Sequence, residues 1–476
     1  MTRTHHELMP PRPGRARQTI AEGSAQYRGR YAEPESGLAL LCPEPVDFVM
    51  VVPVCAESAA FVDGYRAAAR GAGRLLVIAV LNGRAEAEDS VHRVNAECFR
   101  QLSARFSLRA LGSGGWLGRD ASMHVLVVDR FTNPRRLPPR QGVGLARKIG
   151  ADIALELIAA GRVRHPFVAM VDADARLPED YFGRIAELEP ECSAAVFPFW
   201  HEPSGGGDVD RATALYEIRL RYFQRGLQWA HSPYAFHTVG STMVVHALCY
   251  AQVRGVPLRQ AGEDFYLLGK LSKLRPLVRL RGEPVRLRSR FSARVPFGTG
   301  PESAKLARGA ELELYHPDCF AAVREVTRGL QRLSGLACVS EVPCSEPGAS
   351  KPRAPAERAP DQDKIEELLS RMSPPVQGFL ESQGALQAWQ QIGKHAPSPA
   401  ARLRRSHDWF DGFRTLKLIH HVRDGVASSL SWQDAIRRAP FMDDVEDDGA
   451  CLSGARTELL RLEQALPRLV GPSIYQ

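Results

Sequence analysis

Apolar runs of strand length alternate with helical patterns along the first half of the chain. The apolar runs predict strands at Phe48–Val54, Leu75–Leu81, His124–Val128, Phe167–Val171, Ala194–Phe199 and Ser241–Val245. Amphipathic patterns between them predict helices over Ala59–Arg70, Ala85–Ser107, Val143–Ala160 and Arg211–Trp229. Because such alternation builds right-handed βαβ units, we expect an α/β fold with a mainly parallel sheet flanked by helices. The glycine-rich stretch Ala110–Gly118 predicts a loop.

A proline-rich segment predicts a division into two domains. Val342–Gln362 contains five prolines and has the composition of a linker. We expect a basic, disordered segment over residues 1–40, an α/β domain over 41–340, a linker over 341–363 and a mostly helical domain over 364–476. Helices of the last domain are predicted at Ile365–Met372, Pro375–Ile392, Trp409–Asp424 and Gly454–Leu469, with Trp389, Trp409 and Trp432 available for a small core.

The composition predicts a cytoplasmic protein. No stretch reaches the roughly 20 unbroken apolar residues of a membrane span, and the basic N-terminus has no apolar signal core. The nine cysteines form no Cys-x-x-Cys pair, which favours reduced thiols and no zinc site. The net charge is +8, and between Arg275 and Arg294 seven arginines accompany one acid. This balance favours an anionic partner without indicating nucleic acid, and it leaves peripheral contact with a membrane open.

Two acidic side chains follow the predicted strand Phe167–Val171. Asp172 and Asp174 are separated by one alanine and lead into a polar segment containing Pro178. In open α/β sheets the ligand crevice lies beyond the carboxyl ends of the strands, and carboxylate oxygens are the ligands that hard divalent cations prefer. The pair therefore predicts a seat for a divalent cation, which in turn can carry a diphosphate.

A second acidic pair, Glu263-Asp264, precedes an apolar stretch that begins at Phe265. Acids in this position commonly do no more than stabilise the start of a helix. The other interpretation is chemical, because a carboxylate in a cleft can take a proton from an attacking hydroxyl. The residues alone leave both interpretations open.

From about residue 46 to residue 300, the chain resembles the family 2 glycosyltransferases, which have the GT-A fold. Five motifs stand in the family's order. They are the Pro-x-x-x-Glu turn at Pro53–Glu57, a helix at Gly144–Gly150 that looks like the family's Gly-x-x-Ala-Arg-Asn-x-Gly helix, the Asp-x-Asp at Asp172–Asp174 that matches the family's metal-binding motif, the acceptor-side glycine turn at Val239–Ser241 and the Glu-Asp at Glu263-Asp264 that matches the family's catalytic pair. The resemblance implies a transferase that moves a sugar, a hexosyl group, from a nucleoside-diphosphate sugar to an acceptor hydroxyl.

The resemblance also implies roles for individual residues. Asp174 would ligate Mn²⁺ or Mg²⁺, with Asp172 as the second acid of the metal site, facing the ribose or the waters of the metal. Asp264 would be the general base, and Glu263 would orient it or the acceptor. A single base opposite the leaving group implies inversion at the anomeric carbon. Donor-binding roles are expected for Pro53, Glu57, Asn82, Arg147, Asp172, Arg290 and Arg294.

The chain departs from the family where the nucleotide base would lie. Cys55 replaces a tyrosine that stacks on the base in many members, and Leu81 replaces an acid that reads uracil, so that only Asn82 remains to bond the base or ribose. UDP, GDP and dTDP donors all stay open. The processive members' Gln-x-x-Arg-Trp motif and membrane helices are missing from this sequence, which argues against synthesis of a long exported polymer.

An alternating run of arginines follows in the same region. Period-two spacing places Arg286, Arg288 and Arg290 on one face of a strand, and guanidinium groups match phosphate oxygens well. This pattern predicts contact with the diphosphate by Arg290 and Arg294. The alternative is a solvated edge strand whose charges prevent aggregation.

Two other classes of function compete with the transferase. One is a GT-A-like module that binds a nucleotide or carbohydrate without turning it over, joined to a helical interaction domain. The other is nucleotidyl transfer, which usually brings a Gly-rich basic loop after the first strand, where this chain has Cys55–Ser58. The acceptor, the donor sugar, the oligomeric state and the role of the helical domain are not determined by the sequence.

Overall fold

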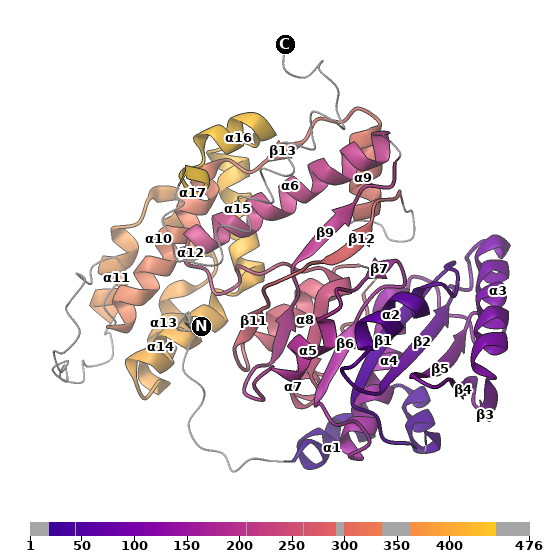
Figure 1. The fold of residues 1–476 in the computed structure, drawn as a ribbon. Helices are drawn as coiled ribbons and strands as arrows, with labels where there is room; N and C mark the ends of the chain where they lie inside the picture. Colours follow the sequence, from indigo (N-terminus) through magenta and orange to yellow (C-terminus); the bar gives the residue numbers. More distant parts are fainter. Residues whose placement is uncertain are drawn as a thin grey trace. The chain divides into compact units, whose positions relative to one another are not determined.

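The computed structural model describes residues 19–42, 44–205, 207–259, 261–291, 299–335 and 362–443. These residues form two compact units. The sheet unit consists of residues 19–216 and His237–Gly309, and the helical unit consists of Glu217–Phe236 and residues 310–443. The helical unit therefore begins before the predicted linker and includes a segment from the middle of the predicted α/β domain. Figure 1 shows the elements of each unit.

A nine-stranded sheet is the framework of the described part of the sheet unit, with the order β11-β8-β10-β6-β1-β2-β5-β4-β3. Only β4 and β10 among these strands run opposite to the others. The strands are β1 (Phe48–Val54), β2 (Leu75–Asn82), β3 (Arg109–Gly112), β4 (Gly115–Arg119), β5 (Met123–Arg130), β6 (Phe167–Met170), β8 (Ala194–Val196), β10 (Met243–His246) and β11 (Leu277–Arg279). The α/β class and the mainly parallel sheet are thus confirmed.

Helices cover the sheet and bury its centre. Every residue of β1 and β2 is buried, as expected for strands with helices on both faces. The helices of this unit are α1 (Ile20–Arg30), α2 (Phe61–Ala69), α3 (Asp89–Phe106), α4 (Val143–Ala159), α5 (Tyr181–Ala186), α7 (Ala247–Gln252), α8 (Glu263–Leu271) and α9 (Thr299–Ala307). Helix α4 approaches β1 closely at Gly150, where an added Cβ would overlap the side chain of Val51.

Two predictions for strands and loops are wrong in detail. The predicted strand Ala194–Phe199 is divided between β8 and β9 (Phe199–Glu202), which belong to different sheets, because Pro198 has no N–H for a continuous ladder. The predicted loop Ala110–Gly118 is instead the β3–β4 hairpin. Its turn residues Ser113 and Gly114 have φ of 51° and 76°, and positive φ at both central residues is the geometry that suits a two-residue hairpin.

The second sheet corrects the interpretation of the arginine run. Strand β12 (Val285–Arg288) lies between β7 (Ala175–Arg176) and β9 in a three-stranded sheet, so it is not an edge strand. Arg286 and Arg288 are exposed on this strand, and Arg286 contacts Glu202 at 3.8 Å and Glu283 at 3.9 Å. Arg290 lies beyond the end of β12.

The chain before β1 is folded from residue 19 onward, so the prediction of disorder is wrong for residues 19–40. Thr19 and Glu22 form a capping box at the start of α1, and a 3₁₀ helix, η1, spans Pro34–Leu41. The Tyr27 hydroxyl of α1 donates a hydrogen bond of 2.7 Å to the buried carboxylate of Asp152 on α4. Residues 1–18 lie outside the described residues.

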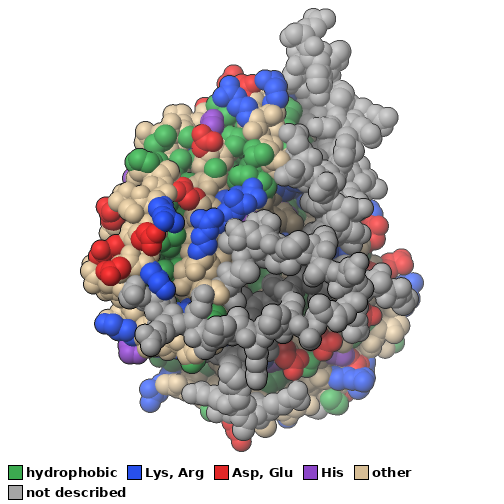
Figure 2. Space-filling view, turned by 90° about the vertical axis from the view of Figure 1, so that its left-hand side faces the viewer, with side chains coloured by type: hydrophobic (Ala, Val, Ile, Leu, Met, Phe, Trp, Pro, Cys, Tyr) green, Lys and Arg blue, Asp and Glu red, His purple; other side chains and the backbone are tan. Residues whose placement is uncertain are grey.

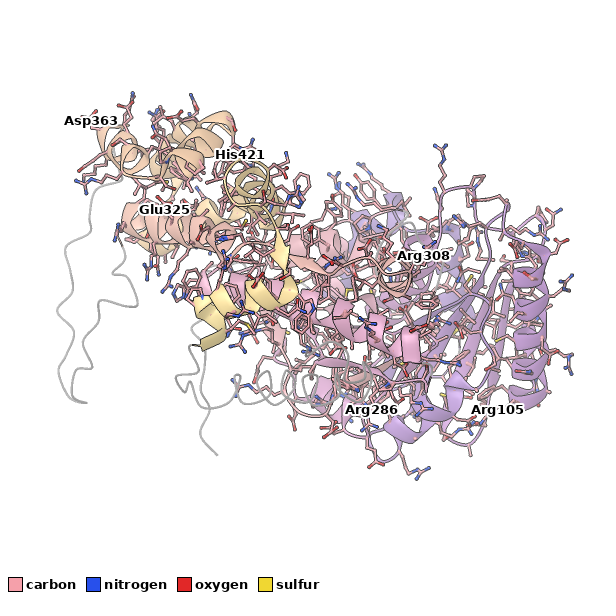
Figure 3. The ribbon with its side chains drawn as sticks, turned by 90° about the horizontal axis from the view of Figure 1, so that it is seen from above. Arg105, Arg286, Arg308, Glu325, Asp363 and His421 are labelled. Carbon is pink, nitrogen blue, oxygen red and sulfur yellow. The ribbon has the colours of Figure 1, made fainter. Side chains whose placement is uncertain are left out.

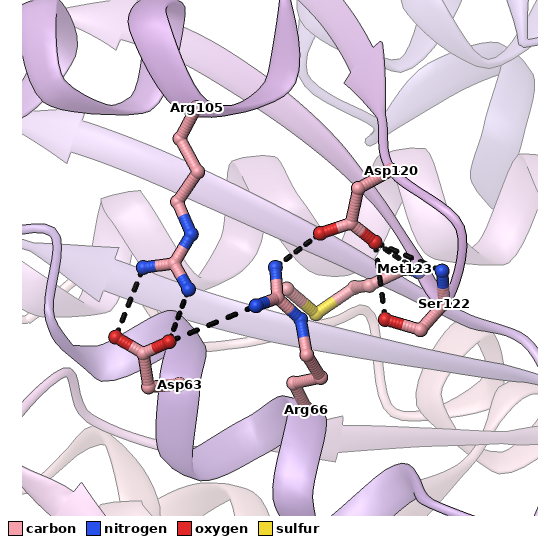
Figure 4. Close-up of polar contacts among 6 residues, drawn as sticks. All are labelled: Asp63, Arg66, Arg105, Asp120, Ser122 and Met123. Atoms are coloured by element: carbon pink, nitrogen blue, oxygen red, sulfur yellow. Dashed lines mark hydrogen bonds and ion pairs between the residues drawn. The ribbon is translucent and has the colours of Figure 1, made fainter.

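Ion pairs connect the surface helices α2 and α3 to the β4–β5 turn (Figure 4). Asp63 on α2 accepts hydrogen bonds from Arg105 on α3, and Arg66 on α2 pairs with Asp120 in the turn. Asp120 also accepts bonds from the backbone N–H groups of Ser122 and Met123. These contacts join α2, α3 and the β4–β5 turn to one another.

The helical unit contains helices that the sequence predicted, but it divides one of them and begins another three residues later. The predicted helix Pro375–Ile392 is broken at Gly384, whose φ is 72°, and the predicted helix from Trp409 begins at Gly412, where Asp411 caps it. The helices are α10 (Pro317–Ser334), α11 (Gln362–Ser370), α12 (Pro374–Ser382), α13 (Ala385–His395), α14 (Pro399–Trp409), α15 (Gly412–Gly425), α16 (Trp432–Arg438) and α17 (Pro440–Asp443). A short pairing of β13 (Glu313–Leu314) with β14 (Leu430–Ser431) accompanies them. Helix α6 (Gly207–Trp229) contributes to this unit from Glu217 onward.

Aromatic and polar contacts hold the helical unit together. Trp389 is 1% exposed and meets Trp409 edge to face, with ring centroids 5.6 Å apart. Ser373, before α12, donates its N–H and hydroxyl to Glu325 on α10, which Figure 3 labels together with Asp363 on α11 and His421 on α15. The predicted helix Gly454–Leu469 and most of the predicted linker lie outside the described residues.

The described surface carries charges of both signs. On the face drawn in Figure 2, Lys and Arg side chains lie interspersed with Asp and Glu and with hydrophobic side chains. Within the described ranges, none of the helices combines the length and apolar character that crossing a membrane requires.

Candidate active site

Acidic side chains gather at the carboxyl ends of β1 and β6. These two strands are parallel neighbours in the sheet, so the residues that follow them emerge at the same edge. Glu57 follows β1, and Asp172 and Asp174 follow β6. A turn fixes the second loop, because the Asp172 carbonyl accepts hydrogen bonds from the Ala175 N–H at 3.0 Å and from the Tyr65 hydroxyl at 2.7 Å.

Arg147 joins the two acidic motifs that the sequence singled out. Its side chain comes from the first turns of α4 and is 3% exposed. One guanidinium nitrogen lies 2.5 Å from the Asp172 carboxylate, and another pairs with Glu263. Gly240 lies against the same group, since an added Cβ would be 2.6 Å from the guanidinium. The predicted donor-binding residue Arg147 is thus engaged with two protein carboxylates.

The Asp172 carboxylate is occupied on both oxygens. Oδ1 faces Arg147, and Oδ2 accepts a hydrogen bond of 2.5 Å from the hydroxyl of Ser241. Ser241 belongs to the predicted glycine turn, which forms a short 3₁₀ helix, Gly240–Thr242. This arrangement orients Asp172 within the site and leaves Asp174 as the acid directed at Arg290.

The pair Glu263-Asp264 begins α8 after Gly262, whose φ of 74° reverses the chain. The helix-start interpretation does not account for Glu263, because its side chain is 5% exposed and pairs with Arg147, 116 residues away in sequence. Asp264 accepts a hydrogen bond of 2.7 Å from the Phe265 N–H. Both acids of the second motif therefore stand in one cluster with Asp172.

Asp264 has the environment of a proton acceptor that works near neutrality. Burial and the neighbouring Glu263 raise the pKa of Asp264 to about 7, against the opposing effects of Arg147 and the Phe265 N–H. A general base is most effective when its pKa lies near the operating pH. The carboxyl is thus suited to take up and release a proton near neutral pH.

Arg290 is the second cation of the cluster. It pairs with Glu57 after β1, and its other nitrogen lies 2.6 Å from Asp174 Oδ2. The predicted donor-binding residues Glu57 and Arg290 and the predicted metal ligand Asp174 are thus brought together. Arg294, the other predicted diphosphate contact, lies outside the described residues.

The predicted base pocket contains a hydrogen-bonded asparagine pair. Asn82 is 4% exposed, and its amide donates to the carbonyls of Val54 and Val80, both at 3.1 Å. Asn95 on α3 donates to the Asn82 carbonyl at 2.9 Å and accepts the N–H of Ala56 at 2.8 Å. These bonds connect the carboxyl ends of β1 and β2, so the Asn82 amide N–H groups bind the backbone. Pro53 is buried within β1, opposite Val80.

Sequence reasoning missed three residues of this region. Tyr65 and Asn95 hold the loops after β6 and β1, and His92 lies buried against Gly83 with both ring nitrogens lacking a partner within the described structure. A signal was present for two of them: His92 and Asn95 are polar residues three positions apart in α3, on the face that packs against the sheet.

The donor atoms of the cluster suit a hard divalent cation. Among the described residues, the carboxylates of Glu57, Asp172, Asp174, Glu263 and Asp264 accompany the guanidinium groups of Arg147 and Arg290. Carboxyl groups therefore outnumber the arginines, and oxygen ligands of this type are those that Mg²⁺ and Mn²⁺ prefer. No group of three or more His, Cys, Asp or Glu side chains in the described ranges is already arranged around a single metal position.

Comparison with known proteins does not place the chain in a family. No protein-family profile and no curated protein matches it. A solved chain described as "Crystal Structure of a Mycobacterial Protein" is 16% identical, with a TM-score of 0.28, and the likeness covers 63% of this chain and 84% of that chain. A likeness at this level carries no argument about family or activity.

Proposed function

We propose that the chain is a metal-dependent, inverting glycosyltransferase of the GT-A type that moves a sugar from a nucleoside-diphosphate sugar to an acceptor hydroxyl. The observation that carries the proposal is the Arg147 bridge. It holds Asp172, next to the Asp174 that would bind the cation, within the same cluster as Glu263 and Asp264. Acids for donor binding and a base for the acceptor are the two functions that such a reaction requires in one place.

Each residue has a defined part in this proposal. Asp174 and Asp172 would hold Mn²⁺ or Mg²⁺, which supplies Lewis-acid stabilisation of the departing diphosphate. Asp264 accepts the proton of the attacking hydroxyl, since its raised pKa gives it affinity for that proton near pH 7. Glu263 and Arg147 keep Asp264 in position. The acceptor attacks from the side of Asp264, so a single displacement inverts the anomeric carbon.

The experiment is nucleoside diphosphate release from a panel of UDP-, GDP- and dTDP-sugars with Mn²⁺, Mg²⁺ or EDTA. We expect one donor to be hydrolysed slowly, with the activity lost in EDTA, in Asp174→Asn and in Asp264→Asn. Glu179→Gln is the matched control, because Glu179 is an exposed acid five residues after Asp174. Its activity should stay within twofold of that of the unmodified chain, on the order expected for an exposed surface substitution.

Binding on the same panel separates the alternatives. Metal-dependent binding of one nucleotide without turnover would indicate that an acceptor is needed for turnover. Binding that EDTA does not affect would favour the non-catalytic nucleotide-binding module. If no sugar nucleotide or nucleoside diphosphate binds, the proposed transferase is wrong.

A further inference from the structure

Arg290 lies between two acidic loops of the proposed donor site, where a positive charge would bind a diphosphate. Its guanidinium pairs with Glu57 from the loop after β1 and with Asp174 from the loop after β6, the second contact at 2.6 Å. The side chain of Arg290 is 29% exposed, and those of Glu57 and Asp174 are each 16% exposed. The contacts are therefore partly shielded from solvent. An ion pair in such a shielded position is stronger than one on an open surface.

This guanidinium is permanently charged. An arginine side chain stays protonated at every pH at which a folded protein is studied. A divalent cation approaching Asp174 Oδ2 meets a positive group at hydrogen-bond distance from the same oxygen. Both cations cannot occupy that position, because like charges at such a separation repel strongly.

We propose that the guanidinium of Arg290 competes with a divalent cation for Asp174 until the diphosphate of the donor binds Arg290 in place of Asp174. This inference rests on the proposed function and adds an order of events to it. A diphosphate offers paired oxygens that match the guanidinium fork, so Arg290 can exchange a carboxylate for a phosphate without losing its counter-ion. Asp174 Oδ2 is then released from Arg290, which removes this competitor of a divalent cation.

The exchange couples metal binding to diphosphate binding. If releasing Arg290 from Asp174 costs free energy, metal binds weakly to the free protein and more tightly once the diphosphate holds Arg290. By linkage, the diphosphate gains the same factor from the metal. Removing the guanidinium abolishes the competition, so it strengthens metal binding in the absence of any nucleotide.

The test measures Mn²⁺ binding to the full chain without nucleotide, from the electron paramagnetic resonance signal of free Mn²⁺. We expect Arg290→Gln to bind Mn²⁺ about tenfold more tightly than the unmodified chain, within the usual range of coupling between ligands. The matched control is Arg288→Gln, which removes the same charge two residues earlier from an exposed position on β12. Its Mn²⁺ affinity should change by less than about twofold, because exposed charges at a distance are screened by salt.

A second variant covers the case in which Arg290→Gln does not fold. Arg290→Lys keeps the charge on a single ammonium that cannot bridge Glu57 and Asp174 in the same way, and we expect Mn²⁺ affinity between those of the other two proteins. The proposal is overturned if neither variant binds Mn²⁺ more tightly than the unmodified chain, including the case in which none of them binds it. Nucleotide binding on the donor panel reports separately on the proposed function. If Arg290→Gln binds Mn²⁺ more tightly but no nucleotide binds, Arg290 competes with the metal and the proposed function is wrong. If a nucleotide binds but the Mn²⁺ affinity of the variants is unchanged, the proposed function stands and the competition is absent.

Discussion

Arg147 joins the two acidic motifs of the candidate site. Its charge is 3% exposed and is neutralised by Asp172 and Glu263, which come from segments far apart in the sequence. Removing one partner from a buried ion-pair network leaves the remaining charges uncompensated. The resulting loss of stability is larger than the net stabilisation that the intact network provides. Arg147 is therefore expected to contribute to stability as well as to the geometry of the cluster.

We predict that Arg147→Met lowers the free energy of unfolding by about 3–5 kcal/mol, since it leaves two carboxylates without their cation. Urea unfolding followed by circular dichroism measures this change. Arg100→Met is the control, because Arg100 is 74% exposed and pairs with Glu97 on the surface of α3, where the loss should be within about 0.5 kcal/mol. Equal, small losses for both variants would contradict a central role for the Arg147 bridge.

The raised pKa of Asp264 predicts a pH-dependent contribution to stability. In the folded chain its pKa is about 7, and its unshifted value is 3.8. Between these values the folded chain keeps a proton that the unfolded chain releases, so stability from this carboxyl is fully present below about pH 4 and is lost as pH rises to about 7. At higher pH the ionised carboxylate stays in an unfavourable environment.

Asp264→Asn removes this titration. We therefore predict that the midpoint temperature of thermal unfolding of the variant, measured relative to that of the unmodified chain, increases as pH rises. The gain should be a few degrees larger at pH 8 than at pH 5, given that about 1 kcal/mol shifts the midpoint by roughly 2–4 °C in larger domains. Asp180→Asn, at a side chain that is 58% exposed, should show no such difference between the two pH values. A pH-independent offset for Asp264→Asn would show that the carboxyl has an ordinary pKa.

At the scale of elements, long and strongly patterned segments were predicted well. Strand β1 spans Phe48–Val54 as predicted, and α4 ends one residue before the predicted end. Strand β1 is buried along its whole length and α4 along most of it, so their sequence patterns reflect the core directly. The β3–β4 hairpin was missed because its residues are mostly exposed and the turn signal Ser113-Gly114 was interpreted as part of a loop.

The candidate site was predictable as a set of acids and not as a network. The Asp-x-Asp and Glu-Asp motifs pointed to residues that the fold does bring together at one edge. The partners of Arg147 and Arg290 could not be predicted, because Asp172, Glu263 and Glu57 lie 25, 116 and 233 positions from the arginine that each one pairs with. These pairings depend on how α4, α8 and the loop after β12 pack.

Helix α4 carries Arg147, so its approach to the sheet determines where the bridge lies. We predict that Gly150→Ala destabilises the chain by about 1–3 kcal/mol, because the added methyl overlaps Val51 of β1 and forces α4 outward. Gly64→Ala in α2 is the control, since nothing lies within 4 Å of its added Cβ and alanine favours a helix, so stability should rise by about 0.5–1 kcal/mol. Urea unfolding of both variants gives the comparison. Stabilisation by Gly150→Ala would show that α4 lies farther from β1.

At the scale of the whole molecule, the division into units differs from the division at the proline-rich segment. The helical unit takes Glu217–Phe236 and residues from Ala310 onward, so part of it precedes the predicted boundary at residue 341. Within this unit, α10 packs against α11, α14 and α15, and Val323 and Val326 on α10 are completely buried. A chain that ended at residue 341 would keep α10 and lose the helices that cover it.

We therefore predict that a fragment of residues 1–341 does not behave as an independent domain. Its apolar α10 face would be exposed to water, and large exposed apolar surfaces lead to association. We expect self-association in size-exclusion chromatography and stronger binding of an apolar dye than the full chain shows. Co-expression with residues 342–476 should restore a soluble complex, because it supplies α11, α14 and α15. A monomeric fragment that unfolds cooperatively and binds little dye would instead show that the proline-rich segment is the true domain boundary.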